Sequence, residues 1–207
     1  NPLDHGWERA MTYTAIDFET ANGYPGGGAS VALVRFDQDG QKLEEFYTLL
    51  RPKHSYFDPG MTAVHNLDEG ECLASAEFDR VWPRMRKFIG NDLLVAHNAV
   101  FDMGVLKGSL EAYDIEAKEM NYLCTLTIAR RIWPNLLSYR LSYLVDYFGM
   151  EYNAHHALDD ALMCGRIFHK QCAGHLDSMF SLRRFLITYK VEPKVIVHHR
   201  TGGDFFL

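Results

Sequence analysis

The chain lacks the features of a membrane or exported protein. No apolar run approaches the roughly 20 residues that a transmembrane helix needs. Residues 1–10 show no basic region followed by an apolar stretch, so no secretory signal is expected there. We therefore expect a cytoplasmic protein without membrane contact, in which residues 1–10 are either a native extension or a leftover of cloning.

Cysteine is scarce, and its spacing excludes the common cysteine-based sites. The sequence holds four cysteines, namely Cys72, Cys124, Cys164 and Cys172. None of them forms a Cys-x-x-Cys pair, which argues against a zinc site. Without a secretory signal, free thiols in a reducing compartment are the simpler interpretation. Internal repeats and low-complexity segments are also absent.

Positive charge is in short supply. Lys and Arg number 21 against 27 Asp and Glu, which gives a net charge of −6. This balance argues against a protein coated with basic surface for nucleic acid. It does not exclude a metal-dependent nuclease, because bound metal ions reverse the local field of their acidic ligands. Basic residues gather only in 183–200, where a solvated tail is the simplest explanation.

The patterning is that of an ordinary globular protein, with 47% hydrophobic and 23% charged residues. We expect strands over 12–18, 30–37, 43–51, 93–96 and 122–126, and helices over 76–89, 99–112, 127–133, 138–148 and 157–172. A hairpin turn at 37–40 joins the second and third strands. Strands first, and then strands alternating with helices, predict an α/β fold with a mixed sheet.

Two carboxylates stand close together at the end of the first apolar run. Alternate residues of a strand point to the same face, so Asp17 and Glu19 project together, whereas Ile16 and Phe18 project to the other face. Two adjacent anions at a buried strand end repel each other, and a divalent cation with oxygen ligands relieves that repulsion. A solvated strand end is the alternative interpretation of this segment alone.

A further acid follows the short strand 93–96. The segment 97–102 reads His-Asn-Ala-Val-Phe-Asp, and Asn98 is a good N-cap for the helix that follows. Helical spacing places Asp102 beside Leu106, on the apolar, core-facing side. A favourable interaction of Asp102 with the helix macrodipole is the competing interpretation.

The last acidic segment, His-His-Ala-Leu-Asp-Asp-Ala, begins at His155 and opens the final predicted helix. At about 100° per residue, Asp160 falls on the small, apolar side with Cys164. Asp159 falls on the charged side with Arg166. Asp160 is therefore expected to face inward, and Asp159 to lie at the surface. His155 precedes the helix, in a predicted loop.

Four inward-facing carboxylates and one loop histidine fit a two-metal phosphodiesterase. Two ions about 4 Å apart clamp the attacking and leaving oxygens of an in-line displacement. Asp17, Glu19 and Asp160 would hold the ion that binds the attacking water. Asp17 would also bridge to the second ion, which Asp102 supports directly or through water. Imidazole titrates near neutral pH, so His155 is suited to act as the base.

These segments, in this order and spacing, are similar to the motifs of the DnaQ-like, DEDD-type 3′–5′ exonuclease superfamily, in its histidine-containing (DEDDh) branch. The matching pieces are 16–20 (Ile-Asp-Phe-Glu-Thr), 97–102, and His155 with Asp160. The chain most resembles the epsilon subunit of bacterial DNA polymerase III and its stand-alone relatives, over residues 13–172.

The resemblance implies a ribonuclease H-like fold with a mixed five-stranded sheet, whose first three strands are antiparallel, flanked by helices. It also implies two Mg²⁺ or Mn²⁺ ions as cofactors. The metal-binding acids would be Asp17, Glu19, Asp102 and Asp160, with His155 as the general base. His156 would then be a neighbour of the base.

The activity that the resemblance implies is a metal-dependent 3′–5′ exonuclease acting on single-stranded DNA 3′ ends. It would hydrolyse phosphodiester bonds and release nucleoside 5′-monophosphates, in proofreading or repair. An exoribonuclease that trims RNA 3′ ends would use the same five residues and stays open. A non-catalytic polymerase-accessory or nucleic-acid-binding module is a third interpretation, and the presence of all five residues argues against it.

Candidate substrate contacts come from the same motifs and from one softer match. The segment 62–67, Thr-Ala-Val-His-Asn-Leu, resembles the family loop that wedges the terminal base, which suggests His65 and Leu67. A surface turn is an equally good interpretation. Asn66 stands where relatives have glycine, and asparagine also tolerates positive φ. The remaining candidates are Phe18, Thr20, Asn98 and Phe101, of which Phe18 also suits the core.

The sequence suggests an exonuclease domain over 11–174, followed by a tail, 175–207, of unknown role. Packing on the domain, self-association and docking to a polymerase all stay open for this tail. Its apolar anchors are Phe185, Ile187, Tyr189, Phe205 and Phe206. The loop 22–30 is unusually rich in glycine and departs from the family pattern, so contacts to the nucleic acid cannot be transferred there.

Overall fold

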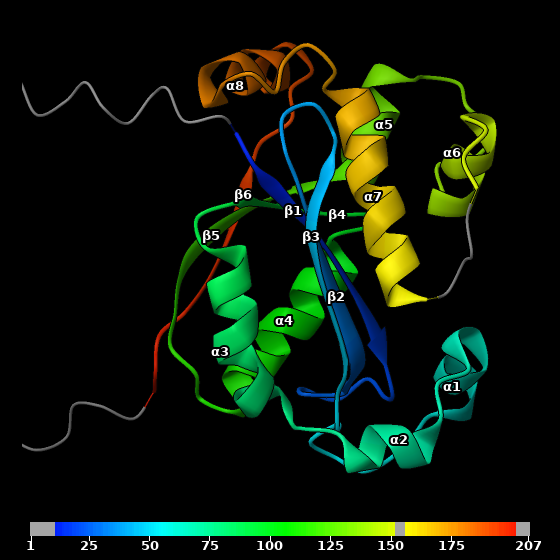
Figure 1. Cartoon of the computed structure of the whole chain (residues 1–207), viewed down its shortest axis with the longest axis vertical. Coiled ribbons are helices and arrows are strands. Elements are labelled where there is room, and N and C mark those ends of the chain that lie inside the picture. Colours follow the sequence, from blue (N-terminus) through cyan, green and yellow to red (C-terminus); the bar gives the residue numbers. More distant parts are fainter. Residues whose placement is uncertain (1–10, 152–155, 202–207) are drawn as a thin grey trace, which may run out of the picture.

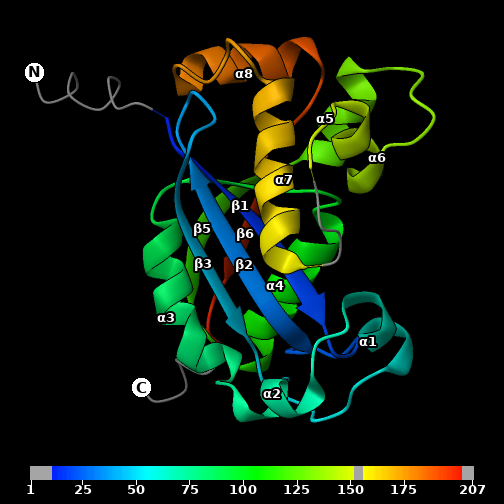
Figure 2. The same cartoon turned by 45° about the vertical axis from the view of Figure 1, so that its right-hand side comes forward.

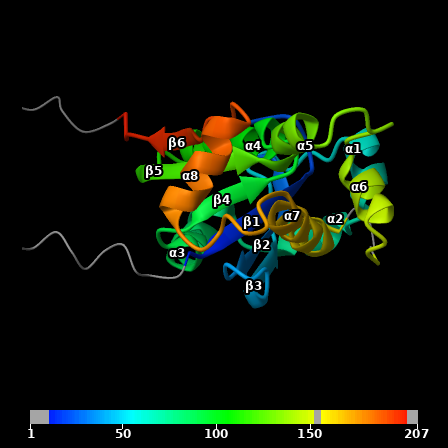
Figure 3. The same ribbon diagram turned by 90° about the horizontal axis from the view of Figure 1, so that it is seen from above.

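A six-stranded mixed sheet forms the centre of the molecule, in the order β3-β2-β1-β4-β5-β6 (Figure 1). The computed structural model describes residues 11–151 and 156–201. The strands are β1 (Tyr13–Thr20), β2 (Gly28–Phe36), β3 (Lys42–Leu49), β4 (Leu93–Ala96), β5 (Ala117–Cys124) and β6 (Lys194–His198). Figure 3 shows them following one another across the molecule from β3 to β6.

The strand directions confirm the predicted mixed sheet. β1, β2 and β3 form an antiparallel meander, and β4 and β5 add in parallel to β1. β6 then pairs antiparallel with β5. The expected count of five strands was one too few. β6 was missed although Val195, Ile196 and Val197 are typical strand residues, because it is short and lies in the segment 175–207, which was interpreted as a tail.

Eight helices are described: α1 (Pro59–His65), α2 (Glu69–Ala74), α3 (Phe78–Ile89), α4 (Val100–Ala112), α5 (Thr125–Ile132), α6 (Leu141–Tyr147), α7 (Ala157–Gln171) and α8 (Met179–Thr188). The five predicted helices correspond to α3 to α7. The short helices α1 and α2 were not predicted, because side-chain caps from Asp58 and Asp68 define them, and they carry no long apolar periodicity. None of the described helices is long and apolar enough to span a bilayer.

The two faces of the sheet are covered by different helices (Figures 1 and 2). α7 packs on the face of Tyr13 and Ala15, and α3 and α4 pack on the face of Ile16 and Phe18. A Cβ atom on Gly165 of α7 would lie 2.0 Å from the ring of Phe36 on β2. Glycine therefore lets α7 approach the sheet closely enough to bring its first turn over β1.

The segment after Gly174 packs onto the sheet. Leu182 and Leu186 of α8 join the core under α7, and Ile196 of β6 joins the core on the opposite face. Of the predicted apolar anchors, Phe185 is buried, whereas Ile187 and Tyr189 remain exposed. Phe205 and Phe206 lie outside the described residues.

The connection from β4 to α4 differs from the prediction. Asn98 is not the N-cap of α4; Ala99 occupies that position, without a side-chain cap. Asn98 instead adopts the left-handed conformation, with φ of 60°. Asparagine tolerates this conformation better than most residues. The chain therefore reverses sharply from β4 into α4. Because β4 ends at this turn, the part of β1 that follows Ala15 has no β4 residue beside it.

Candidate active site

β1 loses one of its two neighbours before it ends. Its pairing with β4 covers only Tyr13 to Ala15, whereas its pairing with β2 continues to Thr20. Beyond Ala15, the side of β1 that faced β4 is open, because β4 ends at Ala96. An irregularity in the β1–β2 register between Glu19 and Thr20 adds a local distortion, a feature common beside active sites.

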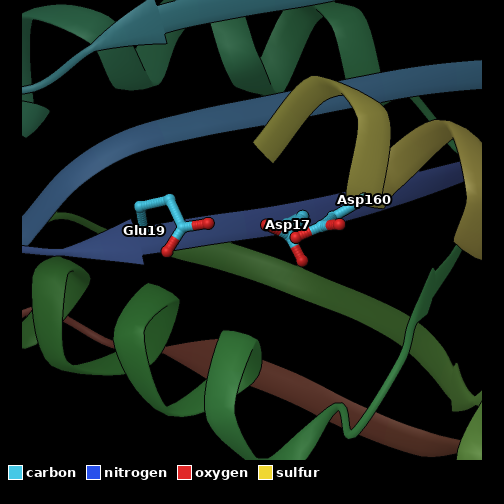
Figure 4. A group of neighbouring side chains, drawn as sticks. All are labelled: Asp17, Glu19 and Asp160. Carbon is cyan, nitrogen blue, oxygen red and sulfur yellow. The ribbon is translucent and has the colours of Figure 1, made fainter. Parts of the chain in front are cut away.

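Three carboxylates gather at this opening. Asp17 and Glu19 come from β1, and Asp160 comes from the first turn of α7 (Figure 4). One oxygen of each lies within 4.8 Å of the oxygens of the other two. Asp160 is 9% exposed, which confirms that it faces inward. Asp159 is partly buried, so its predicted surface position is only partly correct.

Asp102 lies outside this group of three, although it is close enough to Asp17 to repel it. Its side chain is buried at 2% exposure, as its helical position predicted. The Oδ1 atom of Asp102 accepts a hydrogen bond from the backbone N–H of Phe18 at 2.9 Å. This N–H belongs to the stretch of β1 that has lost its β4 partner. Asp102 therefore ties α4 to β1 at the point between Asp17 and Glu19.

Burial and mutual repulsion raise the pKa values of the acids. Burial raises the pKa of Asp17 well above its usual range, and Asp102, Asp160 and Glu19 raise it further. Burial, followed by repulsion from Asp160, raises the pKa of Glu19 to about 7. Burial also raises the pKa of Asp102 to about 8, although the Phe18 N–H opposes this effect. Without a counter-charge, these acids cannot all be ionised near neutral pH.

A divalent metal ion fits this set of donors. The clustered donor atoms are all carboxylate oxygens, which are the ligands that Mg²⁺ and Mn²⁺ prefer. A cation among Asp17, Glu19 and Asp160 would stabilise the ionised forms that burial and repulsion disfavour. Asp102 lies outside this tight group, and it has already committed one oxygen to Phe18.

The predicted substrate residues His65 and Leu67 lie at the end of α1 and just after it, next to the end of β1. His65 is buried, and its Nε2 atom lies 3.1 Å from the carbonyl oxygen of Thr20. Its Nδ1 atom accepts a hydrogen bond from the N–H of Leu67 at 3.0 Å, so Nε2 carries the proton. Asn66 adopts a positive φ of 54°, as its sequence position predicted. Both ring nitrogens of His65 thus serve to fix α1 against β1, and any contact of the ring with substrate would be by packing.

The candidates on β1 and α4 divide into buried and exposed side chains. Phe18 is buried in the core at 2% exposure, as its alternative interpretation suggested. Thr20 is also largely buried, and its hydroxyl contacts the sulfur of Met61. Asn98 and Phe101 are exposed beside Asp102, with Phe101 at 45% exposure. The exposed pair is therefore placed where a nucleotide could be contacted, and its substrate role stays a prediction.

The proposed base, His155, lies outside the described residues. The neighbouring His156 precedes α7, and its ring stacks on Tyr47 of β3 with 5.1 Å between centroids. Its carbonyl oxygen accepts the N–H of Asp160 at 3.0 Å. These contacts give His156 a packing role at the start of α7, and the assignment of the base to His155 stays a prediction.

Sequence reasoning missed the role of His97. Its Nε2 atom donates to the carbonyl oxygen of Tyr139 at 2.9 Å, and its Nδ1 atom lies 2.8 Å from the Thr125 hydroxyl. Burial lowers its pKa to about 4, so the ring is neutral. His97 therefore joins the end of β4 to the starts of α5 and α6. Its position directly after a wholly apolar strand was the signal from which its partly buried, structural role could have been predicted.

Comparison with known proteins identifies the family. The RNase T family model, described as exonuclease, matches residues 14–168. The chain belongs to this exonuclease family. The matched region contains Asp17, Glu19, Asp102 and Asp160.

Individual relatives agree with this assignment. The DNA polymerase III subunit epsilon of Aquifex aeolicus (strain VF5) is 30% identical over 164 residues, covering 77% of this chain and 79% of the relative. A Mycobacterium tuberculosis (strain CDC 1551 / Oshkosh) protein, MT2247, named as a bifunctional exonuclease/endonuclease, is 32% identical over 178 residues. That match covers 81% of this chain and 27% of the relative, so the chain corresponds to only part of the larger protein.

A solved structure supports the same conclusion for the fold. Exonuclease X in complex with 5′-overhanging duplex DNA superposes with a TM-score of 0.64 at 25% identity. The superposition covers 77% of this chain and 90% of exonuclease X. The ribonuclease H-like fold expected from the motifs is thereby confirmed.

Proposed function

We propose that this exonuclease is a metal-dependent enzyme that removes nucleotides from the 3′ end of single-stranded DNA and releases nucleoside 5′-monophosphates. The observation that carries the proposal is the convergence of Asp17, Glu19 and Asp160 within 4.8 Å, from two elements far apart in the sequence. The match to the epsilon subunit supports the 3′–5′ direction and a role in proofreading or repair.

The acids would hold two Mg²⁺ or Mn²⁺ ions, with Asp17, Glu19 and Asp160 as direct ligands and the second oxygen of Asp102 as a further donor. When bound, such ions neutralise the phosphate and lower the pKa of a coordinated water. The Phe18 N–H keeps the Asp102 carboxylate oriented toward β1. His155 is retained as the proposed general base, and this assignment rests on the family resemblance alone.

The partners that we propose follow from this activity. A single-stranded 3′ end is the expected substrate, with DNA favoured over RNA because the sequence relatives include a DNA polymerase subunit. A polymerase subunit or a second copy of the chain is the proposed partner of the segment 175–207, beyond the packing of α8 and β6 described above. A cytoplasmic location agrees with these roles.

The test is hydrolysis of end-labelled oligonucleotides with and without Mg²⁺. We expect 5′-labelled single-stranded DNA to shorten stepwise from its 3′ end, and EDTA to stop the reaction. Matched RNA should be degraded more slowly. Faster degradation of RNA would replace this proposal with an exoribonuclease, and no Mg²⁺-dependent hydrolysis of either would indicate a non-catalytic module.

A further inference from the structure

Two loops at the active-site end of the sheet carry exposed aromatic side chains. The loop after β1 holds Tyr24, which is 59% exposed, and the segment after β3 holds Tyr56, which is 51% exposed. The rings of Tyr24 and His54 contact each other at 5.3 Å between centroids. The adjoining rings of Tyr24 and His54 form a cluster, and clustered exposed rings mark binding sites more often than single exposed residues do.

The buried side chain of Asn22 holds the two loops together. Its Nδ2 atom donates to the carbonyl oxygens of Tyr56 at 2.7 Å and His54 at 3.2 Å. Its Oδ1 atom accepts the N–H of Tyr24 at 3.0 Å. Asn22 is 2% exposed, so its side chain is buried between the two loops. One amide therefore fixes the backbones of all three ring-bearing residues relative to one another.

Glycine allows this close approach. A Cβ atom on Gly27 would lie 2.4 Å from Oδ1 of Asn22, and the carbonyl oxygen of Gly26 accepts the N–H of Lys53 at 2.9 Å. The glycine-rich stretch thus folds into a compact, bonded loop that presents Tyr24 outward. Aromatic rings on a prearranged backbone lose less conformational freedom when they bind a ligand.

The charge of the two loops favours a polyanion. The segments 22–28 and 51–57 contain Arg51 and Lys53 and no acidic residue, although the chain as a whole carries −6. Lys53 donates to the carbonyl oxygen of Ala112 and lies over the ring of Tyr113. Asp58 follows the second segment directly, but it is the N-cap of α1, where its Oδ1 atom accepts the N–H groups of Gly60 and Met61. Arg51 and Lys53 are exposed on the segment that also carries His54 and Tyr56, and their positive charge favours a phosphate backbone.

The loops lie at the end of the sheet that carries the candidate active site. Tyr24 follows Glu19 by five residues, so its Cα lies within about 18 Å of the Glu19 Cα. Both loops follow strands that end at the same end of the sheet, which is the end at which β1 presents its carboxylates. α8 lies at the opposite end of the molecule (Figure 1). A strand whose 3′ nucleotide occupies the carboxylates could therefore reach the rings with its next nucleotides.

We infer that Tyr24, His54 and Tyr56 form a stacking platform for the bases that lie 5′ of the cleaved nucleotide in single-stranded nucleic acid. This inference rests on the proposed nuclease function. Stacking on aromatic rings is tolerant of sequence, because every base has a π face. The platform therefore raises the affinity for single-stranded nucleic acid without base preference, and it binds DNA and RNA alike.

The experiment compares binding and hydrolysis in matched variants. Fluorescein-labelled oligothymidylate and oligouridylate are titrated in Ca²⁺, and the double variant Tyr24→Ala/Tyr56→Ala should raise the Kd by about 5- to 100-fold for both. Tyr24→Phe/Tyr56→Phe, which keeps the rings, should restore wild-type affinity. Phe180→Ala on α8 removes an equally exposed ring at the far end, at 66% exposure, and should change nothing.

Hydrolysis of a small substrate tests the proposed nuclease function independently of the stacking platform. Hydrolysis of the p-nitrophenyl ester of thymidine 5′-monophosphate needs only the carboxylate site, so the double alanine variant should keep the wild-type rate. If wild-type protein hydrolyses neither substrate, the proposed function fails. If it hydrolyses both while the alanine variant binds oligonucleotides as tightly as wild type, the platform is wrong and the rings face another partner.

Discussion

The backbone N–H of Phe18 donates to the Asp102 carboxylate at 2.9 Å, although 84 positions separate the two residues. The bond fills the place that a β4 residue would take if the parallel pairing of β1 continued past Ala15. Asp102 thus replaces a strand as the partner of β1, and it does so between the two acids of that strand. The end of the β1–β4 pairing and the gathering of the acids around β1 therefore have the same structural origin.

Replacing Asp17 should separate stability from activity. Asp17→Asn removes a buried carboxyl group that, without metal, must either take up a proton or repel its acidic neighbours, so the metal-free protein should melt at a higher temperature than wild type. Hydrolysis should fall by at least about 10³-fold, since metal-ion catalysis supplies several kcal/mol. Thermal unfolding and oligonucleotide hydrolysis measure the two effects. Asp159→Asn is the matched control, with activity near wild type; equal loss in both variants would refute the assignment of Asp160 over Asp159.

Stability should depend on pH in opposite ways with and without metal. The folded pKa values of Glu19 and Asp102, about 7 and about 8, lie above the usual carboxyl value near 4. The folded state then binds more protons than the unfolded state, so metal-free stability should fall as pH rises from about 4 to about 8.

Magnesium should reverse this loss, because it favours the ionised carboxylates. The rise in melting temperature on adding MgCl₂ should therefore grow with pH and level off above about pH 8. Thermal melts across this range, with NaCl of equal ionic strength as the control, measure the difference. A magnesium effect of constant size from acid to alkaline pH would contradict the acid cluster as the binding site.

The two adjacent histidines should behave differently. His155→Ala should lower the hydrolysis rate by about 10²- to 10⁴-fold, the usual contribution of a positioned base. His156→Ala should keep the rate within a few-fold, but it removes the ring contact with Tyr47 and should cost about 1 kcal/mol of stability. Single-turnover rates and urea unfolding measure both. The reverse pattern would show that the register of the motif is shifted by one residue.

The approach of α7 to the sheet should be sensitive to one methyl group. In Gly165→Ala the new Cβ would lie 2.0 Å from the ring of Phe36, so α7 must move away and take Asp160 with it. We expect a loss of about 1–3 kcal/mol in stability and a marked loss of Mg²⁺ affinity.

Gly104→Ala in α4 is the control for this substitution. A Cβ there meets nothing within 4 Å, so the change should stabilise the helix by about 0.5–1 kcal/mol. Urea unfolding and Mg²⁺ titration compare the two variants. If Gly165→Ala were as stable as Gly104→Ala, the close packing of α7 on β2 would be incorrect.

Local spacing made most of the site predictable. The two-residue spacing of Asp17 and Glu19 places both on one face of any strand, and the angle between successive helical residues is enough to separate Asp160 from Asp159. The glycine-rich loop could not be interpreted in the same way. Its conformation depends on hydrogen bonds from Asn22 to a segment more than 30 residues away, and no local pattern encodes such bonds.

The sequence by itself determined which residues are acidic, which faces they take on their own strand or helix, and hence the family and the kind of chemistry. Only the tertiary structure decided that β4 turns away at Asn98, that Asp102 then bonds to the Phe18 N–H, and that β6 completes the sheet. The reason is that side-chain direction follows from the local backbone repeat, whereas strand neighbours and loop contacts join residues far apart in the chain.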